Sequence, residues 1–375
     1  MKLQHKFGLL LSSLSLFSFI SSAEAEPKVV TSIKPIHSLV SYVMDGVGRP
    51  DLLVDGSSSP HTFQLKPSHA TMLQEADIVF WIGEDLESFL ETPLDSIAAS
   101  AKRVTLMDSD QIELLKFREK NVFDDHHDDH DDHDEHEDHA DGHDEHDEHD
   151  EHDEHDEHDE HDEHDEHDEH DEHDEHDEHD GHDDHEEHAD GHDDHDEHEG
   201  HDDHGHHHGE HDIHFWLDPE IAKTIVSIAS EELSEIDPAN KSIYSSNAAN
   251  AINDLDQLID NTRSKINSDA TYIVFHDAYQ YFEQRFGIEV IGALTVNPEV
   301  LPGAKQLAEI REVIEHESVN CLFSEPQFNP SIAETIASDT GIKSAVLDPL
   351  GAELEPGKDL YFDLIGDIAS SFENC

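Results

Sequence analysis

Residues 238–267 read PANKSIYSSNAANAINDLDQLIDNTRSKIN, a stretch with no glycine and with its only proline at the first position. Apolar side chains recur in it near helical spacing, at Ile243, Ile252, Leu255, Leu258 and Ile259. A helix of this length would extend for roughly 43 Å at 1.5 Å per residue. Most helices of globular proteins are shorter. The stretch therefore predicts a rigid linking helix (238–267) between two lobes.

Short β-branched runs alternate with helical patterns on both sides of this helix. Before it, we predict strands at 28–33, 51–54, 77–82 and 103–106, and helices that begin near Pro35, Pro67 and Leu86. After it, we predict strands at 271–275, 288–291, 320–323 and 343–347, and helices at 277–286, 303–317, 331–340 and 359–372. This alternation is typical of parallel sheets covered by helices. We therefore expect an α/β protein with an N-terminal lobe (26–123 with 213–237) and a C-terminal lobe (268–375).

The segment from Asp124 to Asp212 interrupts the first lobe and has a composition of its own. It holds 31 of the 38 histidines and 50 of the 94 acidic residues, and no lysine, arginine or hydrophobic residue larger than alanine. From His143 to His179 it is an unbroken repeat of Asp, Glu and His. Such a segment cannot bury enough apolar surface to offset chain entropy, and its charges repel one another. We expect it to be disordered without metal.

Histidine and carboxylate are the only abundant ligands in this segment, and they indicate divalent metal. Neutral imidazole suits zinc, copper and nickel, while carboxylates suit harder ions. We interpret the segment as many weak, exchangeable sites. Its accessory metal ligands include His126, His143, His179, His206, His207, His208 and His211. The alternative is a plain acidic linker, which would not need a histidine at every third position.

The N-terminus and the two cysteines indicate export. Lys2 and Lys6 precede a short apolar run, and Ala23-Glu24-Ala25 is a typical cleavage site, so we predict a signal peptide (1–25) that is cleaved after Ala25. In an oxidising compartment, Cys321 and Cys375 favour a disulfide over a metal site. A disulfide that closes a loop of about 55 residues would stabilise the fold by roughly 4 kcal/mol.

Seven histidines lie outside the acidic segment, and four of them carry little functional signal. His5 belongs to the signal peptide. His69 and His316 fall in polar helical stretches, so we expect them at the surface. His37 follows Pro35 in the first turns of a helix, where a capping or packing role is expected.

The other three histidines each follow a strand or loop signal. His61 lies in a turn-rich stretch after the second strand, His214 closes the acidic segment, and His276 ends the run Tyr272-Ile-Val-Phe-His. In open α/β sheets, ligands bind beyond the carboxyl ends of the strands. We therefore predict that the three share a metal site. Asp348 ends a strand in the second lobe and is a candidate fourth ligand.

Several ordered motifs resemble the zinc-binding periplasmic proteins of ABC transporters, the ZnuA type of solute-binding protein. The matching stretches are Gly56-Ser-Ser-Ser-Pro-His61 with Leu65-Lys-Pro-Ser68, Ala76-Asp-Ile-Val-Phe-Trp-Ile-Gly83, His214-Phe-Trp-Leu-Asp-Pro219, Phe275-His-Asp-Ala-Tyr279, Thr295-Val-Asn-Pro-Glu-Val-Leu-Pro-Gly303, Ser324-Glu-Pro-Gln-Phe328 and Leu347-Asp-Pro-Leu-Gly351. The resemblance spans nearly the whole mature chain, including a His/Asp-rich insert, which is unusually long here.

The resemblance implies two α/β lobes joined by a long helix, with one metal ion in the cleft between them. It places ligand roles on His61 and His214 from the first lobe and on His276 from the second, and it implies a disulfide between Cys321 and Cys375. Pro60 departs from the pattern, since some members have a glutamate there that approaches the zinc. The fourth position is then left to water or Asp348, while Glu325 is expected to be a structural or cleft residue.

Three imidazoles with one open position suit zinc, whereas manganese-binding relatives use a harder ligand set. We therefore predict a monomeric periplasmic protein that captures Zn²⁺ and delivers it to an ABC permease with a cytoplasmic ATPase, without nucleic acid. The alternatives are a periplasmic metal buffer or chaperone, or a manganese-type receptor. An enzyme is not expected, because the sequence lacks both an H-E-x-x-H motif and a Walker phosphate loop.

The isolated segment 124–212 should bind zinc more weakly as the pH falls toward about 6. Neighbouring carboxylates raise the pKa of each imidazole, and a protonated imidazole cannot bind metal. Zinc titrations of this peptide at about pH 6 and about pH 7.5 would measure the effect. Equal affinity at the two pH values would contradict the interpretation.

Overall fold

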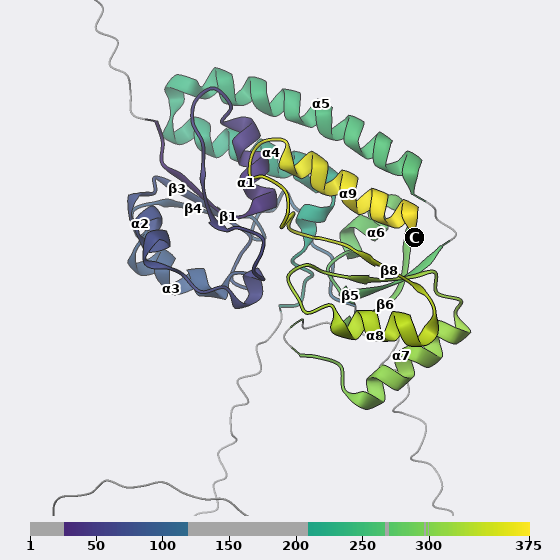
Figure 1. The fold of residues 1–375 in the computed structure, drawn as a ribbon. Coiled ribbons are helices and arrows are strands. Elements are labelled where there is room, and N and C mark those ends of the chain that lie inside the picture. Colours follow the sequence, from purple (N-terminus) through teal and green to yellow (C-terminus); the bar gives the residue numbers. More distant parts are fainter. Residues whose placement is uncertain (1–25, 119–208, 267–269, 296–297, 299) are drawn as a thin grey trace, which may run out of the picture. The chain divides into compact units, whose positions relative to one another are not determined.

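The computed structural model describes residues 26–118, 209–266, 270–295, 298 and 300–375. The predicted signal peptide (1–25) and residues 119–208, which include most of the histidine-rich segment (124–212), lie outside the described residues, so their roles stay predictions. Figure 1 shows two groups of strands, one in the purple and blue part of the chain and one in the green and yellow part. Within the described ranges, no helix is both long and apolar enough to span a membrane.

The first sheet is parallel, with the strand order β2-β1-β3-β4. Its strands are β1 (Val29–Ile33), β2 (Asp51–Val54), β3 (Ile78–Trp81) and β4 (Lys102–Thr105). The central strands β1 and β3 are buried along their whole length, as expected where helices cover a sheet. The helices are α1 (Lys34–Val43), α2 (Pro67–Glu75) and α3 (Ser88–Ser96). Each strand agrees with its predicted range to within one residue at each end.

The second sheet repeats this topology in the order β6-β5-β7-β8. Its elements are β5 (Thr271–His276), α6 (Gln280–Phe286), β6 (Glu289–Thr295), α7 (Ala304–His316), β7 (Cys321–Ser324), α8 (Ser331–Thr340), β8 (Lys343–Val346) and α9 (Leu360–Asn374). Strand β6 runs beyond its predicted end because it continues to pair with β5 as far as Thr295. Helix α6 begins three residues later than predicted, after a loop in which the Ala278 N–H bonds to the His276 carbonyl. The predicted α/β class is confirmed.

The linking helix is real but shorter than predicted. A 3-10 turn, η4 (Pro238–Asn240), precedes α5 (Lys241–Lys265), whose 25 residues extend for about 37 Å. Its buried face includes Tyr244, whereas the predicted face residue Ile243 is exposed. Figure 1 shows α5 running past α1 of the first lobe and α9 of the second, and it contacts both. It packs most extensively on α4 (Pro219–Ile236), a helix that we did not predict.

The hydrophobic core is shared by the two sheets. One buried cluster includes residues of both sheets together with α4, α5 and α9. A smaller cluster packs β5, β6 and β7 against α7 and α8. The disulfide joins Cys321 in β7 to Cys375 at the end of α9. It therefore ties the last helix of the chain to a central strand of the second sheet.

The turn after β8 connects the second lobe to the first. Buried Lys34, at the start of α1, donates hydrogen bonds of 2.9 Å to the carbonyls of Gly351, Ala352 and Leu354. The indole N–H of Trp216 donates to the Pro349 carbonyl at 2.9 Å. Burial lowers the pKa of Lys34, and these carbonyls compensate its ammonium group for lost water. The turn is thereby fixed against the first lobe.

Glu87 fixes the loop between β3 and α3. It is fully buried, and its carboxylate accepts the backbone N–H groups of Ile82 and Gly83 at 3.0 Å. Gly83 has a φ of +154°, which side-chain-bearing residues rarely adopt. Burial raises the pKa of Glu87 to about 7, although these hydrogen bonds oppose the shift. The neighbouring Leu86 lines the cavity described below.

Replacement of Glu87 by glutamine should remove a pH dependence of stability. A carboxyl group with a folded pKa of about 7 and an unfolded value of 4.5 contributes stability below pH 4.5 that is lost as the pH rises toward 7. Relative to Glu87→Gln, the parent protein should lose about 3 kcal/mol across this window. Denaturant unfolding at several pH values would measure the difference. The exposed Glu91→Gln on α3 is the control, and a pH-independent difference for Glu87→Gln would contradict the prediction.

Candidate metal centre

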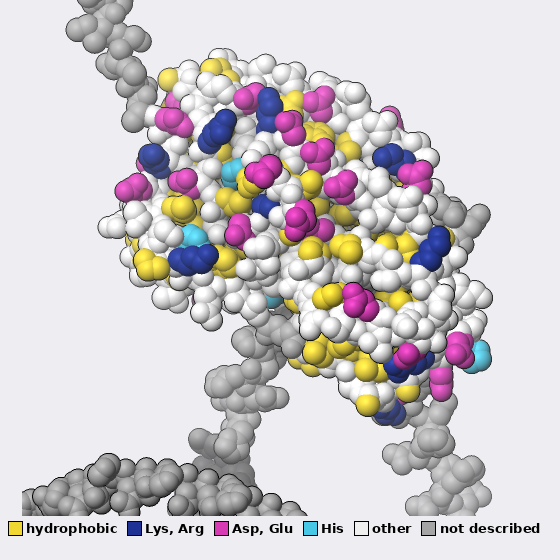
Figure 2. Space-filling view, in the orientation of Figure 1, with side chains coloured by type: hydrophobic (Ala, Val, Ile, Leu, Met, Phe, Trp, Pro, Cys, Tyr) yellow, Lys and Arg dark blue, Asp and Glu magenta, His cyan; other side chains and the backbone are white. Residues whose placement is uncertain are grey.

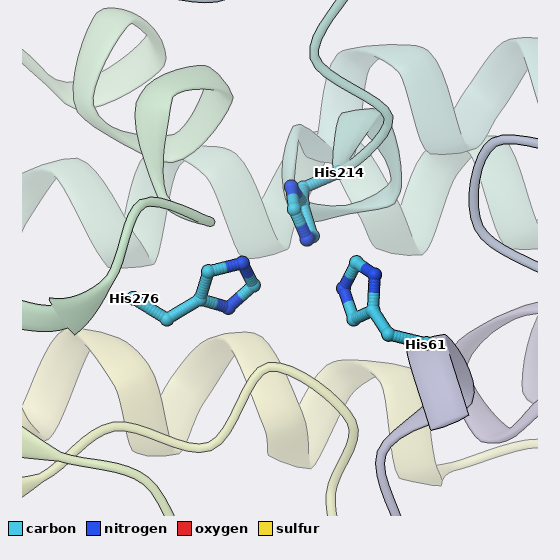
Figure 3. A group of neighbouring side chains, drawn as sticks. All are labelled: His61, His214 and His276. Atoms are coloured by element: carbon cyan, nitrogen blue, oxygen red, sulfur yellow. The ribbon is translucent and has the colours of Figure 1, made fainter. Parts of the chain in front are cut away.

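Three histidine side chains that are distant in sequence meet in the structure. One nitrogen from each of His61, His214 and His276 lies within 4.8 Å of the corresponding atoms of the other two. The ring centroids of His214 and His276 are 4.9 Å apart, and that of His61 lies 5.5 Å from His276 and 5.9 Å from His214. Figure 3 shows the rings around a common space. Because a zinc–nitrogen bond is about 2 Å long, small side-chain movements would let all three bind one ion.

His61 and His276 come from the carboxyl ends of strands in different sheets. His276 is the last residue of β5 and is buried. His61 follows β2 in the 3-10 turn η1 (Pro60–Thr62), where its backbone N–H bonds to the Ser59 hydroxyl at 3.3 Å. Its side chain is half-buried. Both residues therefore lie beyond the carboxyl ends of parallel strands, where ligands of α/β proteins are expected to gather.

His214 precedes the 3-10 turn η3 (Phe215–Leu217), which leads into α4. The ring is buried and packs against Trp216, with centroids 5.2 Å apart. Its Nδ1 lies 2.8 Å from Oδ1 of Asp212, which is also buried. The other ring nitrogen, Nε2, is therefore the one available to the common space. Sequence reasoning missed Asp212, although its position beside the first apolar residue, Ile213, sets it apart from the other acidic residues.

The three imidazoles open into one cavity with mainly apolar walls. Besides the histidines, it is lined by Ser59, Pro60, Leu86, Trp216, Glu325, Gln327, Phe328, Pro349 and Leu350. These residues come from both lobes, so the cavity lies between them. Burial lowers the pKa of His214 well below its usual value, and the nearby His276 lowers it further. The His214 ring is thereby kept neutral, which is the form that binds metal.

Comparison with known proteins identifies the family. The sequence model of the ZnuA family, described as "Zinc-uptake complex component A periplasmic", matches residues 29–375. The chain belongs to this family. It is 39% identical to the high-affinity zinc uptake system protein ZnuA of Brucella abortus (strain 2308), over 98% of both chains. It is 38% identical to the protein of the same name from Haemophilus influenzae (strain ATCC 51907 / DSM 11121 / KW20 / Rd), also over 98% of both.

Solved structures share the fold of this ZnuA-family chain. A crystal structure of ZnuA matches with a TM-score of 0.64 and 18% identity, covering 94% of this chain and 99% of that one. A zinc-bound ZnuA deletion mutant matches with a TM-score of 0.62 and 19% identity, covering 93% of this chain and 98% of that one. These likenesses support the two-lobe architecture.

Asp348, the candidate fourth ligand, is not part of the histidine group. Its carboxylate accepts hydrogen bonds from the side-chain amide of Gln327 at 2.9 Å and from the backbone N–H groups of Leu350, Gly351 and Ala352 at 3.0, 2.9 and 2.5 Å. Asp348 thus accepts four hydrogen bonds, and three of them fix the backbone of the turn to which Lys34 donates. Its metal-ligand role stays a hypothesis, and these contacts disfavour it.

Glu325 is the carboxylate that lines the cavity. It follows β7, is 3% exposed, and has Oε2 3.7 Å from Nδ1 of His276. Its Oε1 is buried without a hydrogen-bond partner among the residues that the structure describes. Burial raises the pKa of Glu325. Its position agrees with the cleft role expected from the resemblance.

The remaining ordered histidines lie apart from the group. His37 is buried, with Nε2 3.1 Å from the Pro50 carbonyl, which agrees with a packing role. His316 is exposed, as expected. The surface prediction for His69 is wrong. This side chain is buried because Nδ1 accepts the Lys66 N–H at the start of α2 and the ring stacks on Phe63.

Residues 209–212, which we expected to belong to the disordered segment, are part of the described structure. Lys116 and His211 form an antiparallel bridge. The Asp212 N–H also donates to the Leu115 carbonyl at 2.8 Å. The last residues of the histidine-rich segment therefore pair with the chain that enters it, and we call this pairing (115–118 with 209–212) the stem. Of the predicted accessory ligands, His211 lies in the stem, while His126, His143, His179, His206, His207 and His208 lie outside the described residues.

Arg118 fastens the stem to the second lobe. Its guanidinium donates to Glu283 on α6 at 2.6 Å and lies 3.3 Å from Asp277. Both carboxyl groups are mostly buried. Burial raises the pKa of Glu283 to about 7 and also raises that of Asp277, while Arg118 opposes both shifts. The stem is thereby attached beside His276.

Replacement of Arg118 by glutamine should destabilise the metal-free protein by about 3 kcal/mol at about pH 8, because two buried carboxylates lose their cation. Denaturant unfolding would measure the loss. Arg103→Gln is the control, since Arg103 pairs with the well-exposed Asp95 and exposed pairs contribute little. Equal effects of the two substitutions would refute the assignment.

Proposed function

We propose that this chain captures Zn²⁺ in the periplasm and delivers it to an ABC-type import permease driven by a cytoplasmic ATPase. The observation that carries the proposal is the convergence of His61, His214 and His276 on one cavity between the two lobes. The relatives named as high-affinity zinc uptake proteins over nearly their whole length support the same role.

The ligand chemistry favours zinc over harder ions. Zinc accepts three imidazoles and one further ligand in a tetrahedral arrangement, whereas magnesium and manganese prefer oxygen. His214 and His276 are each 3% exposed, so water competes little for the site. Burial also keeps His214 neutral before metal arrives. The site can therefore bind zinc without first displacing a proton from this ring.

Glu325 is a better candidate for the fourth position than Asp348, because it lines the cavity and Asp348 does not. Glu325 lines the cavity and has one oxygen without a partner among the described residues. Asp348 is held by Gln327 and by backbone N–H groups of its own turn. We therefore assign the fourth ligand to Glu325 or to a water molecule, in place of Asp348.

Binding and transport explain the arrangement better than catalysis. The ligands come from both lobes, so an ion bound between them is enclosed when the lobes are together. Apolar residues such as Leu86 and Phe328 occupy the cavity wall. Enclosure of this kind suits a cargo ion.

Zinc calorimetry on four proteins would test the proposal. The full chain should show one tight site and many weaker ones. A deletion of 124–208, which retains the stem residues after it, should keep the tight site, because its ligands lie elsewhere. His276→Ala should weaken that site by roughly 100-fold or more, since even indirect partners of metal ligands contribute 10–100-fold. The exposed His316→Ala should leave it unchanged.

The same series separates the alternatives. Loss of all tight binding in the deletion would contradict the proposal and favour a metal buffer that uses the histidine-rich segment. Tighter binding of manganese than of zinc would favour a manganese-type receptor. In the deletion background, Glu325→Gln should weaken zinc binding if the carboxylate is a ligand, whereas Asp348→Asn should lower the unfolding midpoint with little change in zinc affinity.

A further inference from the structure

The contact between Asp212 and His214 is a short hydrogen bond between two buried side chains. Oδ1 of Asp212 lies 2.8 Å from Nδ1 of His214, and the two residues are 1% and 3% exposed. The same oxygen accepts the backbone N–H of His214 at 2.9 Å. Because this oxygen already serves as the acceptor of the backbone N–H, the geometry favours Nδ1 as the donor of the side-chain hydrogen bond. The lone pair of this ring then lies on Nε2.

Asp212 is itself held in place from two directions. Its N–H donates to the Leu115 carbonyl at 2.8 Å, which belongs to the stem. Its carbonyl accepts the hydroxyl of Tyr281 on α6 at 2.7 Å, and the Leu115 N–H donates to that hydroxyl oxygen at 2.8 Å. The position of the carboxylate is therefore fixed by the entering chain and by the second lobe together.

We propose that Asp212 is a positioning residue, which holds the His214 ring in the tautomer and orientation that present Nε2 to the zinc ion. The inference rests on the proposed function, because it takes His214 as a zinc ligand. Figure 3 shows one nitrogen of this ring directed toward the other two histidines and the other directed away. Without the carboxylate, the ring proton can occupy either nitrogen, and a proton on Nε2 blocks the metal.

At His276, the contact with the nearby carboxylate is longer. Glu325 Oε2 is 3.7 Å from Nδ1 of His276, beyond hydrogen-bond distance. His61 is half-buried in a turn and closer to solvent. The contact with Asp212 thus directs the His214 ring more firmly than Glu325 directs the His276 ring before metal binds. Partners of this kind typically contribute 10–100-fold to metal affinity.

The tautomer of His214 in the metal-free full chain is the first measurement. Nitrogen-15 spectra of the histidine side chains at about pH 8 should show this ring protonated at Nδ1, with the resonance identified by its absence from His214→Gln. Asp212→Ala should move protonation toward Nε2. The zinc dissociation constant, measured by competition with a chromophoric chelator, should rise by about 10–100-fold. Asp212→Asn keeps an oxygen acceptor and should lie between the parent and the alanine variant.

Asp237→Asn is the matched control. Asp237 is also buried and accepts hydrogen bonds from Asn240 and Tyr244, but it belongs to the turn before α5. This substitution should change neither the tautomer nor the zinc affinity. The control separates loss of a buried aspartate from loss of the contact with His214.

Two results would overturn the inference. One is an unchanged tautomer in Asp212→Ala, whatever happens to zinc affinity, because a merely structural residue would leave the ring proton in place. The other is a shifted tautomer with unchanged zinc affinity. If Asp212→Ala does not fold, Asp212→Asn supplies both comparisons. Failure of the proposed function looks different: the parent protein would lack a tight site that depends on His276, while the tautomer would still report on Asp212.

Discussion

The metal centre depends on the fixed packing between two parallel sheets. His61 follows a strand of the first sheet, and His276 ends a strand of the second. Each sheet directs the carboxyl ends of its strands toward the space between the lobes, where ligands of α/β proteins bind. Helix α5 and the turn anchored by Lys34 keep the lobes in this relation. A shift by the length of one side chain would leave the nitrogens too far apart to bind one ion.

The site also concentrates buried acid beside its ligands. Asp212 and Glu325 are almost completely buried, and burial raises the pKa of both carboxyl groups. A buried carboxylate is costly without a cation or sufficient hydrogen bonds. Zinc bound by the three imidazoles would supply positive charge near these two groups, because Asp212 contacts His214 and Glu325 lies beside His276. The two buried carboxyl groups destabilise the metal-free site, and they would favour the binding of a divalent ion over that of a monovalent one.

The sequence was informative where structure follows local pattern. Strand positions, the long helix and His276 at a strand end could be predicted because periodicity and the position of ligands in α/β sheets are regular. Helix α4 carries equally clear signals, with Asp218 as its cap and Pro219 in its first turn, so the same rules could have found it. The roles of His69 and Asp348 were harder to predict from sequence. Both side chains accept backbone N–H groups, whose directions are set only after a turn has formed.

Asp212 illustrates a different limit. By composition it is one more acidic residue of a segment that holds 50 of them, and only its position beside Ile213 distinguishes it locally. Its burial follows from tertiary contacts with Leu115 and Tyr281. On the face drawn in Figure 2, acidic and basic side chains are interspersed, so acidic residues are not concentrated there as they are in the histidine-rich segment. The histidine-rich segment supplies 50 of the 74 excess negative charges of the chain, and the two acidic residues beside the histidines, Asp212 and Glu325, are buried.

The stem explains how so long a segment can be inserted beside a ligand without disturbing it. Pairing between Lys116 and His211 brings the two ends of the segment together, and Arg118 fastens this base to α6. Once the ends are fixed, lengthening the chain between them changes closure entropy only slowly. Ligands on a flexible chain must lose entropy to chelate, so they bind more weakly than a preformed site. If the segment binds zinc as its composition predicts, it would raise the local supply of zinc, whereas we expect the affinity of the site between the lobes to depend on the three histidines and the stem. A change in its length should therefore alter the site between the lobes little, whereas a change in the few residues that connect it to His214 should alter that site more.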